Sequence, residues 1–105
     1  MMELTLLGTG CPSVDSKRFG SANLISTKKT KILVDCGSGV TQRLHQAKVS
    51  SADIDVLFLT HLHSDHVVDP YQLIISSWHS YRIKPWKVYG PVSYTHLTLP
   101  TILLV

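Results

Sequence analysis

Hydrophobic and polar side chains alternate along the chain in short stretches that predict β-strands. In the first stretch Glu3 and Thr5 alternate with Leu4 and Leu6, the period of a half-buried strand whose leucines form the apolar face. The third stretch is a continuous apolar run, which predicts a strand buried on both faces. The predicted strands cover residues 2–7, 21–26, 31–36, 56–59 and 85–89.

Between the third and fourth predicted strands the period changes to that of a helix. Val40, Leu44 and Ala47 recur at positions i, i+4 and i+7, and they predict a short helix with one apolar face. The polar run 27–30 separates the second and third strands and predicts a turn. The chain is therefore expected to begin with hairpins before it alternates strands with helices.

A second helix is expected after residue 68. Asp69 followed by Pro70 combines an N-cap residue with a first-turn proline, which is typical of a helix start. Ile74, Trp78 and Tyr81 then line one face of that helix, and we expect the two aromatic residues in the core or at an interface. Hairpins followed by strand–helix alternation predict an α/β (α+β) fold, a mixed β-sheet with helices on one face.

Composition places the chain among single-domain globular proteins. It has 105 residues, of which 44% are hydrophobic, and this share excludes a disordered or collagen-like chain. Ten Lys and Arg against seven Asp and Glu give a net charge of +3. No stretch reaches the roughly 18 apolar residues of a membrane span, and the first residues lack signal-peptide features. We therefore expect a cytoplasmic protein with no membrane partner, in which Cys11 and Cys36 are unpaired and buried.

The last fourteen residues differ in composition from the rest of the chain. Residues 92–105 hold eight apolar side chains and none that is ionised at neutral pH except, on protonation, His96. A terminal strand interrupted by Pro100 is one interpretation. We favour another, because residues 92–101 resemble the translation of a sequencing-library adapter. On that interpretation the native domain is residues 1–91, and residues 92–105 are a non-native tail without function.

Candidate chemistry converges on the segment 60–66, directly after the fourth predicted strand. Four side chains that bind metals fall within six residues: His61, His63, Asp65 and His66. In an extended segment His61 and His63 point the same way, and a turn near Ser64 would direct the other two to an adjacent point. Imidazole and carboxylate suit Zn²⁺, with Mn²⁺ or Fe²⁺ as alternatives, and the lack of a nearby Cys disfavours a closed structural zinc site. The spacing therefore predicts a site for two cations.

The stretch 59–66 resembles the metallo-β-lactamase-fold hydrolases, whose hallmark is the pattern His-x-His-x-Asp-His. An arylsulfatase-like branch of that superfamily is similar at other positions, which are Cys11, Pro12, Ser64, Asp69 and residues 78–82. The resemblance covers nearly all of residues 2–91 and implies the N-terminal half of an αββα sandwich. Four further segments follow the order seen in the ribonuclease Z branch: 7–10, 18–25, 32–37 and 88–91.

The resemblance also implies a role for each residue of the cluster. His61 and His63 would bind one zinc ion, whereas Asp65 and His66 would bind the other. Asp65 would in addition orient or deprotonate the attacking water, as the catalytic residue. Asp35 would hold the metal-binding loop by hydrogen bonds, although an ordinary carboxylate at a strand end is the alternative. His45 and His79 stand apart from the cluster and are expected at the surface.

The resemblance implies a hydrolase in which hydroxide held by two zinc ions attacks a phosphodiester, as in tRNA 3′-end processing, or a related ester. RNA or a small ester is then the expected substrate. An arylsulfatase-like hydrolase of the same fold and a non-catalytic metal- or RNA-binding protein are the alternatives. The family's remaining ligands lie beyond residue 91, so the 105-residue chain is itself expected to be inactive. The oligomeric state stays open, with a homodimer of the full-length protein as one alternative.

Overall fold

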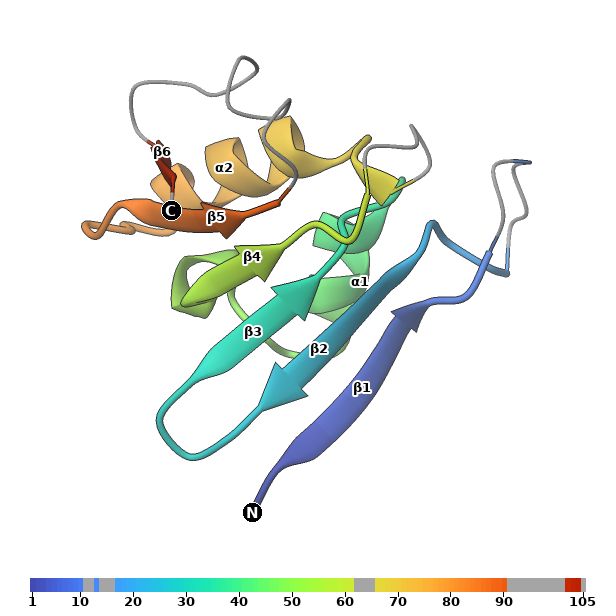
Figure 1. The fold of residues 1–105 in the computed structure, drawn as a ribbon, viewed down its shortest axis with the longest axis horizontal. Coiled ribbons are helices and arrows are strands. Elements are labelled where there is room, and N and C mark those ends of the chain that lie inside the picture. Colours follow the sequence, from blue (N-terminus) through green and yellow to red (C-terminus); the bar gives the residue numbers. More distant parts are fainter. Residues whose placement is uncertain (11–12, 14–16, 62–65, 91–101, 105) are drawn as a thin grey trace.

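A computed structural model describes residues 1–10, 13, 17–61, 66–90 and 102–104. Its strands form one sheet, in which each strand neighbours the strands before and after it in sequence (Figure 1). The first two pairings are antiparallel and the later three are parallel. The strands are β1 (Glu3–Gly8), β2 (Ala22–Ser26), β3 (Lys31–Val34), β4 (Val56–Phe58), β5 (Trp86–Tyr89) and β6 (Ile102–Leu104).

Helices supply the crossovers for two of the parallel pairings, β3 with β4 and β4 with β5. Helix α1 (Val40–Gln46) and the 3₁₀ helix η1 (Ser51–Asp53) lie between β3 and β4, whereas α2 (Pro70–His79) lies between β4 and β5. Figure 1 shows α1 and α2 behind the sheet, on the same side. The predicted fold class, a mixed sheet with helices on one face, is thereby confirmed. Within the described residues, neither helix is long and apolar enough to cross a membrane.

The core lies between the helices and the face of the sheet that they cover. A row of side chains crosses four adjacent strands in register, and all are essentially buried: Leu24, Leu33, Leu57 and Val88. Register partners point to the same face of a sheet, so these four side chains form a continuous apolar surface. The helices cover it with the buried side chains Val40, Leu44 and Leu73.

The first strand alternates as predicted, but the predicted burial of its leucines is wrong. Leu4 and Leu6 are 63% and 59% exposed, whereas Leu7 is buried. The register explains the difference, because Thr5 pairs with the buried Leu24 and so faces the helices. Leu4 and Leu6 therefore lie on the opposite face of the sheet.

That opposite face is largely apolar. Leu4, Ile25, Ile32 and Val56 stand in register across four strands. Beside them the rings of Phe58 and Tyr89 stack with centroids 4.9 Å apart. No described helix or strand covers this face, on which Leu4 and Phe58 are exposed and Ile25, Ile32 and Val56 are half-buried.

The third strand and the first helix differ in detail from the prediction. The strand ends at Val34 instead of residue 36, because Asp35 adopts a left-handed backbone conformation with φ 64°. Burial on both faces is also wrong, since Ile32 and Val34 are only half-buried. In α1 the predicted Ala47 is exposed and follows the helix, so that Val40, Thr41 and Leu44 form its buried face.

Helix α2 begins at Pro70 as predicted, but it turns another face inward. Leu73 and Ser77 are buried, and Ile74 is half-buried, whereas Trp78 and Tyr81 are exposed. A buried serine is stable here because its hydroxyl donates to the Ile74 carbonyl at 2.7 Å and accepts from the indole nitrogen of Trp86 at 3.1 Å. Periodicity could not choose the face, because this helix is apolar on two sides.

Three segments meet through their backbones near the carboxyl ends of β1 and β3. A Cβ atom on Gly8 would lie 1.7 Å from the Gly20 carbonyl oxygen, and one on Gly20 would lie 2.2 Å from the Ser38 nitrogen. The Gly20 nitrogen donates to the Ser38 carbonyl at 2.9 Å, and the Gly37 nitrogen donates to the Ser21 carbonyl at 3.1 Å. Glycine is therefore required at positions 8 and 20, because a side chain at either position would clash with the neighbouring backbone.

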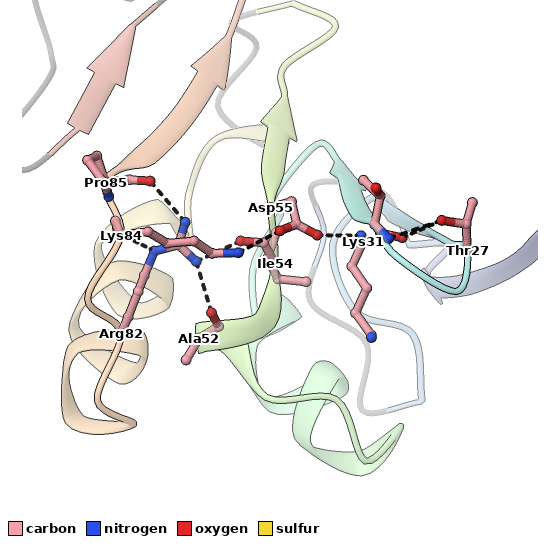
Figure 2. A network of polar contacts seen from close by, with 9 residues as sticks. Thr27, Lys31, Ala52, Ile54, Asp55, Arg82, Lys84 and Pro85 are labelled. Carbon is pink, nitrogen blue, oxygen red and sulfur yellow. Dashed lines mark hydrogen bonds and ion pairs between the residues drawn. The ribbon is translucent and has the colours of Figure 1, made fainter.

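Figure 2 shows a polar network at the other edge of the molecule. The Arg82 guanidinium lies 4.0 Å from the centre of the Trp86 ring and joins the segment after α2 to η1 and to Ile54, which follows η1. Stacking and several backbone bonds together fix this side chain in one geometry. Its acceptors are the carbonyl oxygens of Ala52, Ile54, Lys84 and Pro85.

Asp55 is the acidic member of this network (Figure 2). Its carboxylate accepts from the Lys31 nitrogen at 2.7 Å and from the Lys84 ammonium at 2.5 Å. Partial burial raises the pKa of the Asp55 carboxyl, but the bonds from Lys84 and Lys31 outweigh burial and leave the pKa below its usual value. The ionised carboxylate therefore stabilises the folded chain.

Replacing this carboxylate should change how stability depends on pH. A lowered folded-state pKa adds stability above the unfolded-state pKa, and this stability is lost as pH falls through the folded-state value. We expect Asp55→Asn to cost under about 1 kcal/mol at pH 7, since the ion pair is partly exposed, and to cost less at pH 3. Urea unfolding at both pH values measures this, with Asp53→Asn on the neighbouring turn as control. An equal loss at both pH values would contradict the assignment.

Candidate metal centre

A buried carboxylate organises the edge of the sheet where β3 and β4 end. Asp35 is 4% exposed, and its carboxylate accepts hydrogen bonds through both oxygens. The Thr60 nitrogen and hydroxyl donate to it, each at 2.8 Å, and the Nδ1 of His66 lies 2.8 Å from its second oxygen. The left-handed conformation of Asp35 ends the strand at the point where these partners are within reach. Asp35 therefore joins the end of β3 to the segments on both sides of the predicted metal loop.

The hydrogen bonds determine which nitrogen of each imidazole carries a proton. A buried carboxylate only accepts, so the Nδ1 of His66 donates to Asp35. The Thr60 hydroxyl gives its proton to Asp35 and so accepts from the Nδ1 of His61, 2.9 Å away. In the neutral form of each ring the lone pair then resides on Nε2, the nitrogen through which the ring would bind a cation.

The structure brings two of the four predicted ligands together. The rings of His61 and His66 have centroids 4.2 Å apart and are tilted by 51°. His63 and Asp65 lie outside the described residues. In the part of the chain that is described, no three His, Cys, Asp or Glu side chains form a group that could hold a metal ion. The donor chemistry of His61 and His66 fits a zinc-like ion, and two ligands fall short of a complete site.

The segment after His66 is held by backbone and side-chain bonds. The Cys36 nitrogen donates to the His66 carbonyl at 2.8 Å, and the Asp69 nitrogen donates to the Cys36 carbonyl at 3.0 Å. Asp69 occupies the predicted N-cap position of α2, but its carboxylate accepts from the nitrogen and hydroxyl of Thr41 on α1 instead, at 2.8 and 2.6 Å. The starts of both helices are thus tied together beside the candidate site.

Thr60 and Thr41 form hydrogen bonds at the candidate site, and the sequence patterns predict no role for either residue. Thr60 links Asp35 to His61, and Thr41 links α1 to Asp69. Threonine is common both in strands and at helix starts, so the residue type alone does not predict these hydrogen bonds. The position of Thr60, between a buried strand and the histidine cluster, is the one available signal.

The predictions for Cys36, His45 and His79 are confirmed, whereas Cys11 is not among the described residues. Cys36 is free and buried, as predicted, and Cys11 lies outside the described residues. Burial raises the pKa of the Cys36 thiol well above its usual value, and the nearby Asp69 and Asp35 add to this. His45 and His79 are exposed, as predicted, and lie away from the candidate centre on α1 and α2.

Comparison with known families and sequences finds several similar proteins. A family model described as "Anti-Pycsar protein Apyc1" matches residues 2–97. Ribonuclease Z of Mycolicibacterium gilvum (strain PYR-GCK) is 43% identical over 94 residues, which cover 87% of this chain and 33% of that protein. The chain thus spans about a third of the length of the curated relatives that it matches.

Comparison with solved structures also finds similar proteins. The metallo-β-lactamase fold protein YhfI from Bacillus subtilis superposes with a TM-score of 0.84 and 25% identity, over 99% of this chain and 46% of that chain. The short form of human tRNase Z superposes with a TM-score of 0.81 and 31% identity, over 92% of this chain and 36% of that chain. The relation therefore covers nearly the whole of this chain and less than half of either neighbour.

Removing the Thr60 hydroxyl should weaken the candidate centre. Thr60→Val deletes a donor to the buried Asp35 carboxylate, and we expect a loss of about 2 kcal/mol in the free energy of unfolding. Thr60→Ser keeps the hydroxyl and should lose less than half of that. Urea unfolding in the presence of a chelator compares the two variants. Equal stability of the valine and serine variants would show that the hydroxyl bond contributes nothing.

Proposed function

Because this chain belongs to the family described as anti-Pycsar protein Apyc1 and has the metallo-β-lactamase fold, we propose that it forms part of a metal-dependent phosphodiesterase. The observation that supports this most is the contact of His66 with the buried Asp35 carboxylate, next to the ring of His61. A carboxylate that orients a histidine in this way is typical of metal sites in proteins. The reaction class follows from the ribonuclease Z relatives.

His61 and His66 would present their Nε2 atoms to the metal, with His63 and Asp65 completing the ligands from this chain. We assign His61 and His63 to one ion and Asp65 and His66 to the other, with zinc as the first candidate and Mn²⁺ or Fe²⁺ as alternatives. When bound, a pair of such ions supplies Lewis-acid activation of water and of the scissile phosphate. The proposal requires further ligands from sequence that this chain does not contain, because each ion has only two ligands here.

The other residues of the centre position these ligands. Asp35 accepts from Nδ1 of His66, which holds the ring in one orientation and makes Nε2 the more basic nitrogen. Thr60 does the same for His61, since its own hydroxyl is held by Asp35. Asp65 would accept the proton of the attacking water, as the general base.

RNA is the substrate that we propose within the phosphodiesters. The relatives named ribonuclease Z and tRNase Z act on RNA by their names, whereas the family description names an anti-Pycsar protein. The net charge of +3 has the sign that attracts a polyanion. Specificity within RNA, including tRNA 3′ ends, would depend on the two thirds of the relatives' length that this chain does not span.

Zinc binding by the 105-residue chain tests the assigned ligands directly. We expect His66→Ala to weaken Zn²⁺ binding at least tenfold, because it removes an Nε2 ligand. Asp35→Asn should weaken it by roughly 10- to 100-fold, since it removes the acceptor that orients His66. Titration calorimetry gives the affinities, and His79→Ala, an exposed histidine on α2, is the matched control. Similar losses for His79→Ala and His66→Ala would refute the assignment.

Hydrolysis tests the reaction. The purified 105-residue chain should show no turnover of an RNA or of an activated phosphodiester with zinc added, because its ligand sets are incomplete. A product of the gene extended past the codon for Pro91 should cleave RNA, and Asp65→Ala should reduce that rate at least a thousandfold by removing the proposed base. Full activity of that variant would exclude the role of Asp65. Cleavage of aryl sulfates and no phosphodiester would exclude the proposed substrate class.

A further inference from the structure

A polar pocket of about 550 Å³ lies between the carboxyl-terminal ends of α1 and α2. Most of its lining comes from the last turn of α1, from residues 48–51 and from Ser76 and Ser80 near the end of α2. The candidate metal centre lies beside the starts of the same helices, so the pocket is at their opposite ends. Pockets of roughly 300–1,000 Å³ are the size that binds small molecules in proteins.

The acceptor oxygens around this pocket are already used by hydrogen bonds within the chain. The Ser50 hydroxyl accepts from the Ala52 nitrogen at 3.2 Å, and the amide oxygen of Gln46 accepts from the Arg43 guanidinium at 2.9 Å. Carbonyls in the last turn of each helix accept from the backbone nitrogens that follow that helix. None of the described residues that line the pocket is Asp or Glu.

Several donors of the pocket, in contrast, remain available to a ligand. The hydroxyls of Ser51 and Ser76 lie 3.1 Å apart and share one hydrogen bond, and no other described group accepts the second proton of the pair. The Ser50 hydroxyl and the Gln46 amide accept through oxygen and keep their own protons. Within the described residues, no hydrogen bond or ion pair uses the Lys48 ammonium.

A lining with free donors, one lysine and no described acidic group fits an oxyanion. A phosphate group offers strong acceptor oxygens and a charge of about −1.5 to −2, and hydrogen bonds to a charged oxygen are stronger than those between neutral groups. Phosphate alone fills only a small part of about 550 Å³. The organic group that the phosphate esterifies therefore has room in the same pocket.

The backbone at Lys48 gives a second, independent reason to assign this lysine to a ligand. Lys48 has φ 61°, in the left-handed region. Its nitrogen donates to the His45 carbonyl and the Val49 nitrogen donates to the Leu44 carbonyl, both at 3.0 Å. These two bonds form the helix end in which glycine is the usual residue at this position, because a Cβ atom is strained there. The chain thus places a cation at the pocket where glycine would be less strained.

We propose that this pocket binds the phosphate group of a phosphate ester. The Lys48 ammonium supplies the positive charge, and the hydroxyls of Ser50, Ser51 and Ser76 donate to the phosphate oxygens. Small monoesters such as nucleotides and the backbone diester of RNA both present this group. The proposal does not rest on the proposed metal centre, because none of these four residues bonds to Asp35, His61 or His66 in the structure.

Amide NMR spectra of the 105-residue chain, freed of metal by a chelator and dialysis, locate the phosphate. Adenosine 5′-monophosphate is the monoester probe, and a short uridylate oligomer with hydroxyl ends is the diester probe. We expect at least one probe to shift residues 45–51 and 76–80 most, with a dissociation constant on the order of 0.1–1 mM, and the probe that binds more tightly identifies the source. Largest shifts in residues 60–66, no shift with either probe, or equal shifts with adenosine, which lacks phosphate, would overturn the proposal.

Substitution of Lys48 separates phosphate binding from folding. Lys48→Gly removes the cation and the backbone strain together, so we expect the affinity for the bound probe to fall at least about tenfold while stability to urea does not decrease. Lys48→Arg keeps the charge and should bind within about threefold of the original chain. The matched control is Lys28→Gly, which removes the same charge from the exposed turn between β2 and β3 and should change the affinity less than about twofold. Unchanged binding by Lys48→Gly, or equal losses for Lys48→Gly and Lys28→Gly, would reject the assigned site.

Discussion

The buried carboxylate of Asp35 is the interaction on which the candidate metal centre depends. A buried charge is costly unless hydrogen bonds compensate it, and here Thr60 and His66 supply them. The same bonds determine the tautomers of His61 and His66 and so the direction of their lone pairs. One carboxylate at a strand end thus supports two imidazoles of the segment 60–66.

The topology explains why these groups meet. Strands β3 and β4 are parallel, and the carboxyl ends of parallel strands lie at one edge of a sheet, where α/β proteins commonly bind ligands. The bonds from Cys36 to His66 and from Thr41 to Asp69 join that edge to both helix starts. At the opposite ends of the strands, Arg82 and Asp55 secure the connections without any candidate ligand (Figure 2).

Much of this arrangement follows from sequence patterns, and the exceptions have physical reasons. The strand and helix positions, the mixed sheet and the burial of Cys36 follow from periodicity and composition. The face of β1 that points to the core does not follow from the pattern. Leu6 and Leu7 are adjacent, so leucines stand on both faces of that strand. The inward face of α2 does not either, since a serine there is buried by its two hydrogen bonds. The left-handed turn at Asp35 was not predicted, because the apolar pattern of residues 32–34 resumes at Cys36 and so favours an unbroken strand.

The glycine stack near the ends of β1 and β3 has a consequence for how this region tolerates sequence change. Gly8 presses on Gly20, and Gly20 presses on the backbone of Gly37 and Ser38, two to three residues beyond Asp35. A methyl group added at position 8 or 20 has no flexible neighbour to displace, so the relief must come from shifting whole backbone segments. The backbone shift caused by such a substitution would therefore reach Asp35 and the imidazoles of His61 and His66. A variant at position 8 or 20 would then have the same effect as a variant that lacks one of these ligands.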